Sequence, residues 1–507
     1  MRIQKEAEMC RRVTVLVVAF SLLLLAPLAL SAGGAGQAAT DDAVDLIWIM
    51  GNPGQVPPDQ AAVEAVLNEI SVREVGVRVT TLYYDNDRTM LAMSAGDDWD
   101  MAFTSEWFNN FSVQARSGYF ADLTDLLPTV APALYETMPE IVWEGAMVDG
   151  RVRAIPVKKD YAAELFFRFD RDLFVDTLGM SPPQLPNDDM TFFELEPYLS
   201  AAKQAYEDGR IGAEGRYPMF LTQGGFAGID ALFDMVNRDA MLGIPYSSVG
   251  TAQGDRIVVT VEHPDMYNRL VKLHEWFNAG YINRDAATIT DAPRYIPIKV
   301  GQGFYGADAI WSGGDGYPQV ISRFSGPFLS TASIRGSMNA ISADSEYQEL
   351  ALRYQQLVNT NQVYRDILRY GVEGTHWNRT PQGLIQVTTT GRERYRPWPF
   401  SQGSYSLSSV EAAEGIDVDP NMWQVIFDGY QDLEATNAIG FTFDIAPVET
   451  EMAAIRAIRD RYWAGLVTGT TDPSVEVPRM IRELEAAGLR NVQREAQRQF
   501  DAFLSGR

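Results

Sequence analysis

The apolar positions near the start of the chain follow two periodicities that alternate. Leu46–Met50 is an uninterrupted apolar run, which is typical of a buried parallel strand. Apolar residues recur every three or four positions over residues 59–76, which predicts an amphipathic helix. β-Branched and aromatic residues over 77–83 and 99–103 predict two more strands, with a short helix between them. This β-α-β-α-β order predicts a parallel α/β sheet.

Polar residues stand at the ends of two of these strands. Asn52 follows the first strand, and Ser105, Glu106 and Trp107 follow the third. Ligands of open parallel sheets bind at the carboxyl ends of strands. These four residues are therefore candidate ligand contacts.

The pattern changes after residue 147. Asp149-Gly150 is a hairpin turn signal, and Leu165–Phe169 predicts a strand that opens a second domain. Helical spacing covers Pro264–Ala279 and returns over 452–462 and 477–503. With about 150 residues per domain, a chain of 507 residues is expected to form two or three domains.

The first 40 residues have the pattern of an export signal. Arg11 and Arg12 precede an apolar run from Val13 to Leu30, and small residues follow. We expect residues 1–31 to be a signal peptide, cleaved at about 31–38. The alternative is a membrane anchor, because the run is long enough to span a bilayer, but Pro27 and the small residues favour cleavage.

Charge and cysteine content argue against several kinds of site. The net charge of -25 argues against a nucleic-acid partner, which needs a basic surface. Loss of residues 1–31 removes four basic and two acidic residues, so the exported chain would carry -25 - 2 = -27. The only cysteine, Cys10, precedes the apolar run, so we expect no disulfide, no thiolate chemistry and no lipid-modified cysteine after the signal.

Motifs for cofactors, metals and hydrolysis are weak. Gly301–Gly306 has G-x-G-x-x-G spacing, but Ala307–Trp311 predicts a strand where a nucleotide site needs a helix. The three histidines, His263, His274 and His376, lack metal-ligand spacing, and no EF-hand type loop is present. We therefore expect no cofactor and no metal, and a bound calcium ion stays open as an alternative because the chain is so acidic. No G-x-S-x-G elbow occurs, and among 67 acidic residues paired carboxylates arise by chance.

Tryptophans in loops are a stronger signal. Trp107, Trp311, Trp377 and Trp398 lie beside glycine, proline or polar residues. Each either caps a core or offers a flat apolar face to a sugar ring.

The segment Tyr370–Trp377 concentrates two glycines, a carboxylate, a histidine and a tryptophan. Two glycines disfavour a helix, so the segment is expected to be a loop that presents Glu373, His376 and Trp377. These side chains either enter a cleft or hold the loop together, with Glu373 and His376 as a pair.

Several segments resemble the family 1 extracellular solute-binding proteins of ABC importers. Val148–Pro156 resembles the first hinge of that family, and residues 103–127 resemble the segment of the family that contains its G-x-L-x-D-L-T motif. Segments 370–377, 436–444 and 466–473 resemble motifs of its large lipoprotein-like branch. The resemblance covers nearly the whole exported chain. It implies an α/β, two-lobed, type II periplasmic-binding-protein-like fold with hinge strands between the lobes and extra C-terminal helices.

The resemblance also implies the division into lobes. Lobe one would comprise residues 42–156 and 325–365, and lobe two residues 157–324 and 366–507. A ligand that closes the lobes must touch both of them. The expected contacts are Asn52, Ser105, Glu106 and Trp107 from lobe one; Lys159, Asp160 and Tyr161 after the first hinge; and Gln223, Trp311, Asp315, Glu373, His376 and Trp377 from lobe two.

The sequence thus predicts a non-enzymatic, monomeric periplasmic receptor that delivers a sugar, in particular an oligosaccharide, to the permease of an ABC transporter. Gram-positive members of the family usually carry a lipobox cysteine, and its absence here implies a free periplasmic protein. Three alternatives stay open: an exported glycoside hydrolase with paired carboxylates, a binding protein for a peptide or another non-sugar solute, and an adhesion or scaffold protein.

Overall fold

The computed structural model describes residues 43–51, 56–185, 189–413, 418–431, 433 and 435–506. The expected signal peptide and the candidate residue Asn52 lie outside these ranges. The elements below all belong to the unit formed by residues 43–507. Within the described ranges no helix is long and apolar enough to cross a membrane.

The first lobe is built on a five-stranded sheet of order β2-β1-β3-β13-β6. Strands β1 (Val44–Gly51), β2 (Val77–Tyr84) and β3 (Met101–Thr104) are parallel, which confirms the predicted order of strands. Strand β13 (Met338–Ile341) is added antiparallel to β3, and β6 (Ile155–Pro156) forms the edge. Both faces of the sheet are covered, which explains the unbroken apolar runs.

Helices α1 (Gln60–Val75), α11 (Gln348–Thr360) and α12 (Gln362–Tyr370) pack together on this lobe. Leu368 and Tyr395 lie in the same core as Trp48. The sequence placed all of residues 366–507 in lobe two, and for this part of the chain that expectation is wrong. The apolar stripe of α12 shows that the helix packs against something, but sequence spacing does not identify the partner helix.

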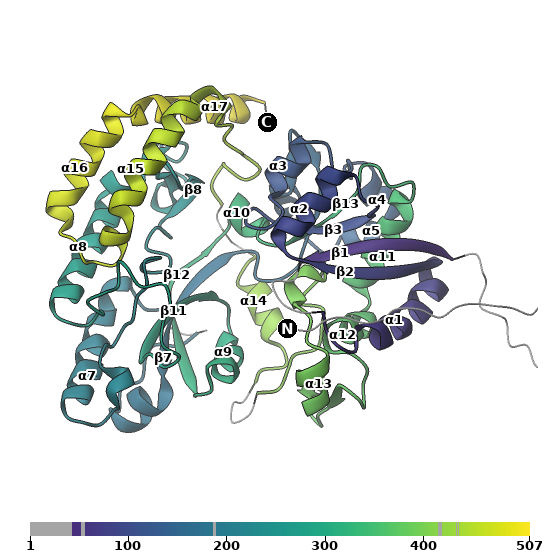
Figure 1. Ribbon diagram of the computed structural model, residues 1–507, viewed down its shortest axis with the longest axis horizontal. Coiled ribbons are helices and arrows are strands. Elements are labelled where there is room, and N and C mark those ends of the chain that lie inside the picture. Colours follow the sequence, from purple (N-terminus) through teal and green to yellow (C-terminus); the bar gives the residue numbers. More distant parts are fainter. Residues whose placement is uncertain are drawn as a thin grey trace, which may run out of the picture. The chain divides into compact units, whose positions relative to one another are not determined.

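The second lobe contains two three-stranded sheets. In the first, β11 (Ile298–Gly303) and β12 (Gln319–Phe328) both run antiparallel to the central β7 (Ala163–Asp170). The second sheet contains β8 (Phe233–Asn237), β9 (Leu242–Pro245) and β10 (Val258–Val259). The strand predicted at 165–169 is thereby confirmed and lies at the centre of its sheet. Figure 1 shows β7, β11 and β12 in one lobe and β1, β2 and β3 in the other.

The strand predicted over Ala307–Trp311 is wrong, because these residues begin helix α9 (Ala307–Asp315). Ala307, Ala309 and Ser312 are buried on one face of this helix. The motif 301–306 therefore does join a strand to a helix. However, β7 separates β11 from β12 and runs antiparallel to both, so the adjacent parallel strands of a dinucleotide site are missing here. A Cβ on Gly303 would lie 2.4 Å from the Trp311 ring, so packing explains that glycine.

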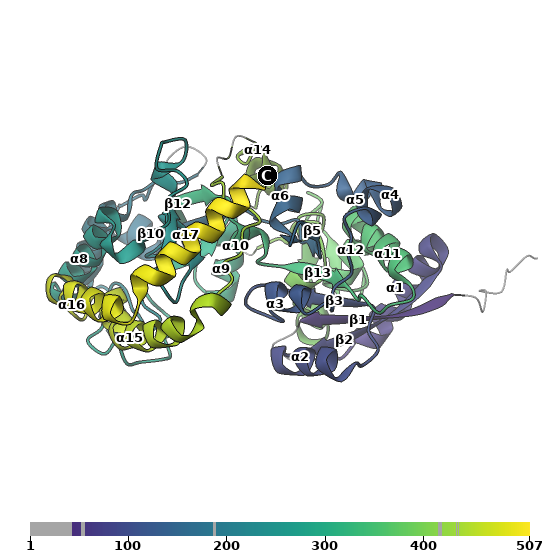
Figure 2. The same cartoon turned by 90° about the horizontal axis from the view of Figure 1, so that it is seen from above.

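Three C-terminal helices complete the second lobe: α15 (Glu449–Val467), α16 (Pro473–Ala486) and α17 (Leu489–Ser505). They pack on one another and on α8 (Pro264–Asn278), and Figures 1 and 2 show them (yellow) gathered on that lobe. The extra C-terminal helices are thus confirmed. The helical pattern over 477–503 is two helices rather than one, because Gly488 has a φ of 99° and turns the chain between them.

The other helices and strands are short connections or cover the sheets. They are α2 (Asn86–Ala95), α3 (Phe111–Arg116), α4 (Leu126–Val130), α5 (Pro132–Tyr135), α6 (Glu140–Gly145), β4 (Met147–Val148), β5 (Arg151–Val152), α7 (Glu196–Glu207), α10 (Thr331–Ile334), β14 (Trp377–Arg379), β15 (Ile385–Val387), α13 (Thr389–Arg394) and α14 (Met422–Asp428). The predicted hairpin at Asp149-Gly150 joins β4 to β5, and both turn residues have positive φ.

Candidate functional site

A cavity of about 790 Å³ lies between the two lobes. Trp107, Ser333 and Gly336 line it from the first lobe, and Gly228 and Phe304 line it from the second. Its volume is within the range of roughly 300–1,000 Å³ that small-molecule sites occupy. A ligand in this cavity would touch both lobes, which is the condition for closure around it.

Two tryptophans from distant segments form an aromatic corner in this cavity. The ring centroids of Trp107 and Trp398 are 5.4 Å apart, and the ring planes meet at 74°. Both rings pack on Phe103 of β3, at 6.1 and 5.3 Å. The Trp107 Nε1–H donates to the Gly336 carbonyl at 2.9 Å, yet the residue remains 59% exposed. The corner therefore offers held but uncovered indole surface, which suits stacking on an apolar ring face.

Trp311 of α9 lines the cavity from the second lobe. The Arg168 guanidinium lies 4.3 Å from the centroid of its ring, in the geometry of a cation–π contact. Asp315 binds Arg168 at 2.5 Å and Lys299 at 2.8 Å. Burial lowers the pKa of Arg168, while the Asp315 charge opposes that shift. Asp315 therefore acts through Arg168 on the Trp311 ring and does not itself line the cavity.

The segment between the lobes contributes an ion pair to the cavity. Lys159 Nζ lies 3.0 Å from Asp160 Oδ1, with 12% and 8% of the two side chains exposed. Two further pairs line the cavity, Arg238 with Asp230 and Arg396 with Glu411. Such pairs provide donors and acceptors for hydroxyl groups without a large net charge.

A buried arginine holds the loop that carries Trp398, Phe400 and Tyr405. Arg365 of α12 is 0% exposed. Its guanidinium donates to the carbonyls of Ser404 at 2.8 Å and Pro399 at 3.1 Å, and to a side-chain oxygen of Gln402 at 3.1 Å. Burial lowers the pKa of Arg365 to about 9, and the nearby Arg369 adds to the shift. The cation is still protonated at neutral pH and fixes this wall of the cavity.

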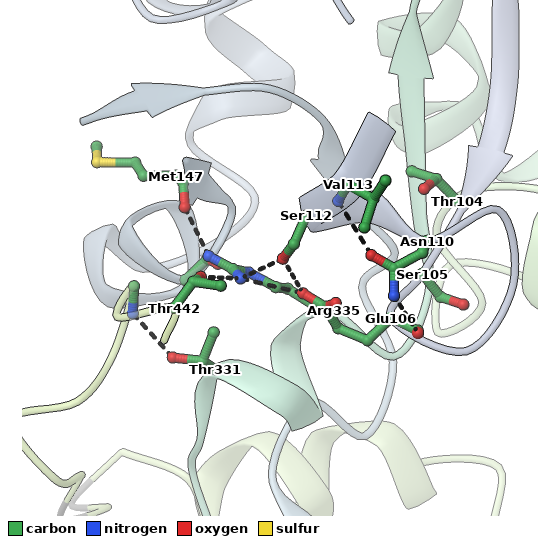
Figure 3. A network of polar contacts seen from close by, with 12 residues as sticks. Thr104, Ser105, Glu106, Asn110, Ser112, Val113, Met147, Thr331, Arg335 and Thr442 are labelled. Carbon is green, nitrogen blue, oxygen red and sulfur yellow. Dashed lines mark hydrogen bonds and ion pairs between the residues drawn. The ribbon is translucent and has the colours of Figure 1, made fainter. Parts of the chain in front are cut away.

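Behind Trp107, a second buried arginine ties the first lobe to the segment that leads into the C-terminal helices. Arg335 is 1% exposed and donates to the carbonyls of Gly145 at 2.7 Å and Met147 at 2.6 Å. It also donates to Ser112 at 3.0 Å and Thr442 at 2.8 Å, and pairs with Glu106 at 3.0 Å. Figure 3 shows Ser112, Glu106 and Thr442 converging on this guanidinium.

The cavity brings together four of the residues predicted from the sequence: Trp107, Lys159, Asp160 and Trp311. It also includes Trp398, which the sequence singled out only as a loop tryptophan. Cavity residues that the sequence did not indicate include Phe304, Arg369, Phe400 and Tyr405. One signal could have found Phe400: it stands with Trp398 in Tyr395–Phe400, where prolines alternate with aromatic residues and preclude a regular helix.

The other predicted residues lie away from the cavity lining. Ser105 is fully buried and its hydroxyl accepts the Phe108 N–H at 2.9 Å, while Glu106 binds Arg335. Tyr161 stacks on Phe427 at 5.8 Å. Gln223 is exposed, and its backbone N–H donates to the Ile289 carbonyl. These side chains were predicted from strand ends and loops, but the direction in which each side chain points depends on its packing partners.

In the loop 370–377 as well, one residue lines the cavity and the predicted contact residues do not. Tyr370 lines the cavity, whereas Glu373 is exposed and Trp377 is 3% exposed in a small core of its own. His376 is 2% exposed and pairs with Asp59 rather than Glu373. Among the described residues, no group of three histidine, cysteine or carboxylate side chains is placed to hold a metal ion.

Comparisons with known proteins show similarity in sequence and in fold. A model of a domain of unknown function, DUF3502, matches residues 437–505, which include α15, α16 and α17. A carbohydrate ABC transporter substrate-binding protein from Streptococcus pneumoniae is 24% identical over 502 residues, 94% of either chain. The solved N-glycan transport solute binding protein (NgtS) of the same species has a TM-score of 0.78 at 22% identity and covers 92% of this chain and 99% of its own. Its complex with Man1GlcNAc has a TM-score of 0.71 at 22% identity, covering 91% and 99%.

Proposed function

We propose that this chain, which has the two-lobed fold of the extracellular solute-binding proteins, is the receptor of an ABC importer. It captures a carbohydrate, in particular an oligosaccharide, between its two lobes. The observation that carries the proposal is the aromatic corner of Trp107 and Trp398 inside a cavity lined by both lobes. Aromatic surfaces on which sugar rings can stack and side chains that can bind hydroxyl groups are combined in one site of suitable size. The Man1GlcNAc complex of NgtS supports a glycan as the ligand class.

The arrangement fits binding better than hydrolysis. A glycosidase needs two carboxylates facing each other across a sugar, about 5–10 Å apart. Among the described residues, the carboxylates that line this cavity are Asp160, Asp230 and Glu411, and each is engaged by a lysine or arginine side chain. We therefore propose that the protein releases its ligand unchanged. Turnover of a chromogenic glycoside by the purified protein would contradict this.

The remaining parts of the proposal concern location and partners. We propose that residues 1–31 direct export, that the protein works as a monomer in the periplasm, and that it passes its ligand to the permease subunits. The presence of a single cysteine, Cys10, supports release rather than lipid anchoring. N-terminal sequencing of the exported protein tests the cleavage site, and sedimentation tests the monomer.

The ligand itself is tested by calorimetric titration against a panel of saccharides, peptides and amino acids. We expect binding of at least one oligosaccharide, with a change in tryptophan fluorescence because Trp107, Trp311 and Trp398 line the cavity. Binding of peptides together with silence toward sugars would contradict the carbohydrate assignment. Silence toward every small molecule would favour an adhesion or scaffold protein.

A further inference from the structure

The charges that line the cavity do not balance. The chain has 67 acidic and 42 basic residues, but among the residues that the structure describes the cavity is lined by three carboxylates and four cations. Three ion pairs account for all but one of these groups. The pairs are Lys159–Asp160, Arg238–Asp230 and Arg396–Glu411, and the remaining cation is Arg369.

Arg369 is held in place by neutral groups. Its guanidinium carbon lies 4.0 Å from the centroid of the Tyr405 ring and 4.6 Å from that of Tyr370. Nη1 donates to the Ser408 hydroxyl at 2.7 Å, and Nη2 donates to the Tyr405 hydroxyl at 2.8 Å. Within the described ranges no carboxylate lies within ion-pair distance of it. The guanidinium is therefore oriented and has no described carboxylate in direct contact, although the negative charges of Glu411 and Asp366 act on it through space.

The nearby carboxylates already have other partners. Asp366 accepts hydrogen bonds from the Ser409 backbone N–H and hydroxyl and pairs with Arg379 at 3.3 Å. Glu411 pairs with Arg396. A guanidinium has five N–H donors, and the two contacts to Ser408 and Tyr405 leave three of them, including Nε–H. Three donors are enough for the two-pronged contact that arginine makes with a carboxylate or sulfate.

The position of Arg369 separates this contact from the aromatic corner. Trp398 lies 5.9 Å from Phe400, Phe400 stacks on Tyr405 at 5.0 Å, and the Arg369 guanidinium carbon lies 4.0 Å from the Tyr405 ring centroid. An anion bound at Arg369 therefore belongs to a different part of the ligand from a sugar ring stacked on Trp398. This spacing suits an oligosaccharide better than a single sugar.

We propose that the ligand is an acidic oligosaccharide, and that Arg369 binds its anionic group, a carboxylate or a sulfate. This inference rests on the proposed function and narrows it. Partly buried cations are costly unless they are paired, and the ligand anion supplies the missing partner. The remaining cavity, with its balanced pairs, binds the hydroxyl groups and ring faces.

The test is calorimetric titration at pH 7 and low salt with matched probes. The probes are a trimer of galacturonate, the same trimer with its carboxylates reduced to alcohols, and a galactose oligomer with and without an O-sulfate. We expect one acidic probe to bind at least tenfold more tightly than its neutral counterpart, with the preference shrinking as salt is added. A preference within the galacturonate pair identifies the anionic group as a carboxylate, and a preference within the sulfated pair identifies it as a sulfate.

Arg369→Gln is expected to abolish that preference while the affinity for the neutral counterpart stays within about twofold. Arg392→Gln removes one positive charge from an exposed position of α13, and this variant is expected to keep the preference for the acidic probe. Circular dichroism confirms that both variants are folded.

Each other outcome has one meaning. If neutral probes bind and their acidic counterparts bind no more tightly, the acidic ligand is wrong and the carbohydrate receptor stands. If Arg369→Gln weakens neutral and acidic probes equally, Arg369 only holds Tyr405 and the inference is overturned. If none of these probes binds but another, neutral saccharide of the panel does, the acidic ligand is wrong and the carbohydrate receptor stands. If no saccharide of the panel binds either, the proposed function itself fails.

Discussion

His376 Nε2 donates a hydrogen bond to a carboxylate oxygen of Asp59 at 3.2 Å, although the two residues are 317 positions apart. The other ring nitrogen, Nδ1, accepts the Val372 N–H at 2.9 Å, so the proton of the neutral ring is on Nε2. Arg394 binds the same carboxylate. The hydrogen bonds from Arg394 and His376 hold the pKa of Asp59 below its usual range. Asp59 thus joins the start of α1 to two later segments of the same lobe.

Replacing His376 is expected to loosen this junction without affecting the cavity. His376→Ala should lower the free energy of unfolding by about 2 kcal/mol, because it leaves the Val372 N–H without its acceptor and removes a buried ring. Urea unfolding measures the change. Glu373→Ala, at an exposed position of the same loop, should stay within about 0.5 kcal/mol of the parent protein. An equal loss in both variants would contradict the assigned role.

Substitution of Trp377 is expected to reduce stability, whereas substitution of Trp107 is expected to reduce ligand affinity. Trp377→Ala should cost about 3–5 kcal/mol of stability, because the residue is buried and its Nε1–H donates to the Gly371 carbonyl at 2.8 Å. The folded fraction should bind ligand as before. Trp107→Ala should change stability by about 1 kcal/mol or less but weaken ligand binding about tenfold or more. Thermal unfolding and calorimetry on both variants check this, and unchanged affinity in Trp107→Ala would remove the aromatic corner from the site.

Asp234 of β8 is expected to make stability fall as pH rises. Burial raises the pKa of Asp234 to about 6, although a hydrogen bond from the Thr436 hydroxyl opposes the shift. The folded protein therefore keeps this proton to a higher pH than the unfolded chain, whose Asp has a pKa of about 3.9. The contribution is complete below about pH 4 and is lost as pH rises to about 6, which amounts to roughly 3 kcal/mol.

Urea unfolding between pH 4 and 7 measures this contribution as the difference between the parent protein and Asp234→Asn. In Asp234→Asn, the free energy of unfolding should lack the fall between pH 4 and 6 that Asp234 causes. Thr436→Val removes the hydrogen bond that lowers the pKa of Asp234, so its slope should extend to higher pH. Parallel curves for all three proteins would show that Asp234 does not titrate in this range.

Arg335 is expected to be the most sensitive position at the junction with the C-terminal segment. Arg335→Met leaves Glu106, Ser112 and two carbonyls without their donor, and should cost about 3–5 kcal/mol. Thr442→Val removes one neutral contact of the same network and should cost about 1 kcal/mol. Thermal unfolding ranks the two variants, and the opposite ranking would contradict this account.

Much of the local structure could be predicted because it depends on residues close together in the chain. The β-α-β-α-β order followed from periodicity, and the hairpin at Asp149-Gly150 followed from turn chemistry. Helix α9 was mistaken for a strand, because Ala307–Trp311 is short and apolar and is compatible with both structures. The resemblance to solute-binding proteins supplied the arrangement in two lobes, which periodicity did not.

The order of residues along the chain was enough to predict a parallel α/β sheet, a likeness to two-lobed solute-binding proteins and an acidic chain with one cysteine. Tertiary structure decided which side chains meet. Trp398 reaches Trp107 because both rings pack on Phe103, and Trp377 is buried instead because its own hairpin encloses it. Arg369 has no carboxylate partner, whereas each of the other charged side chains described in the cavity lining has one. Pairing depends on distances between segments far apart in the chain, and neither composition nor spacing contains those distances.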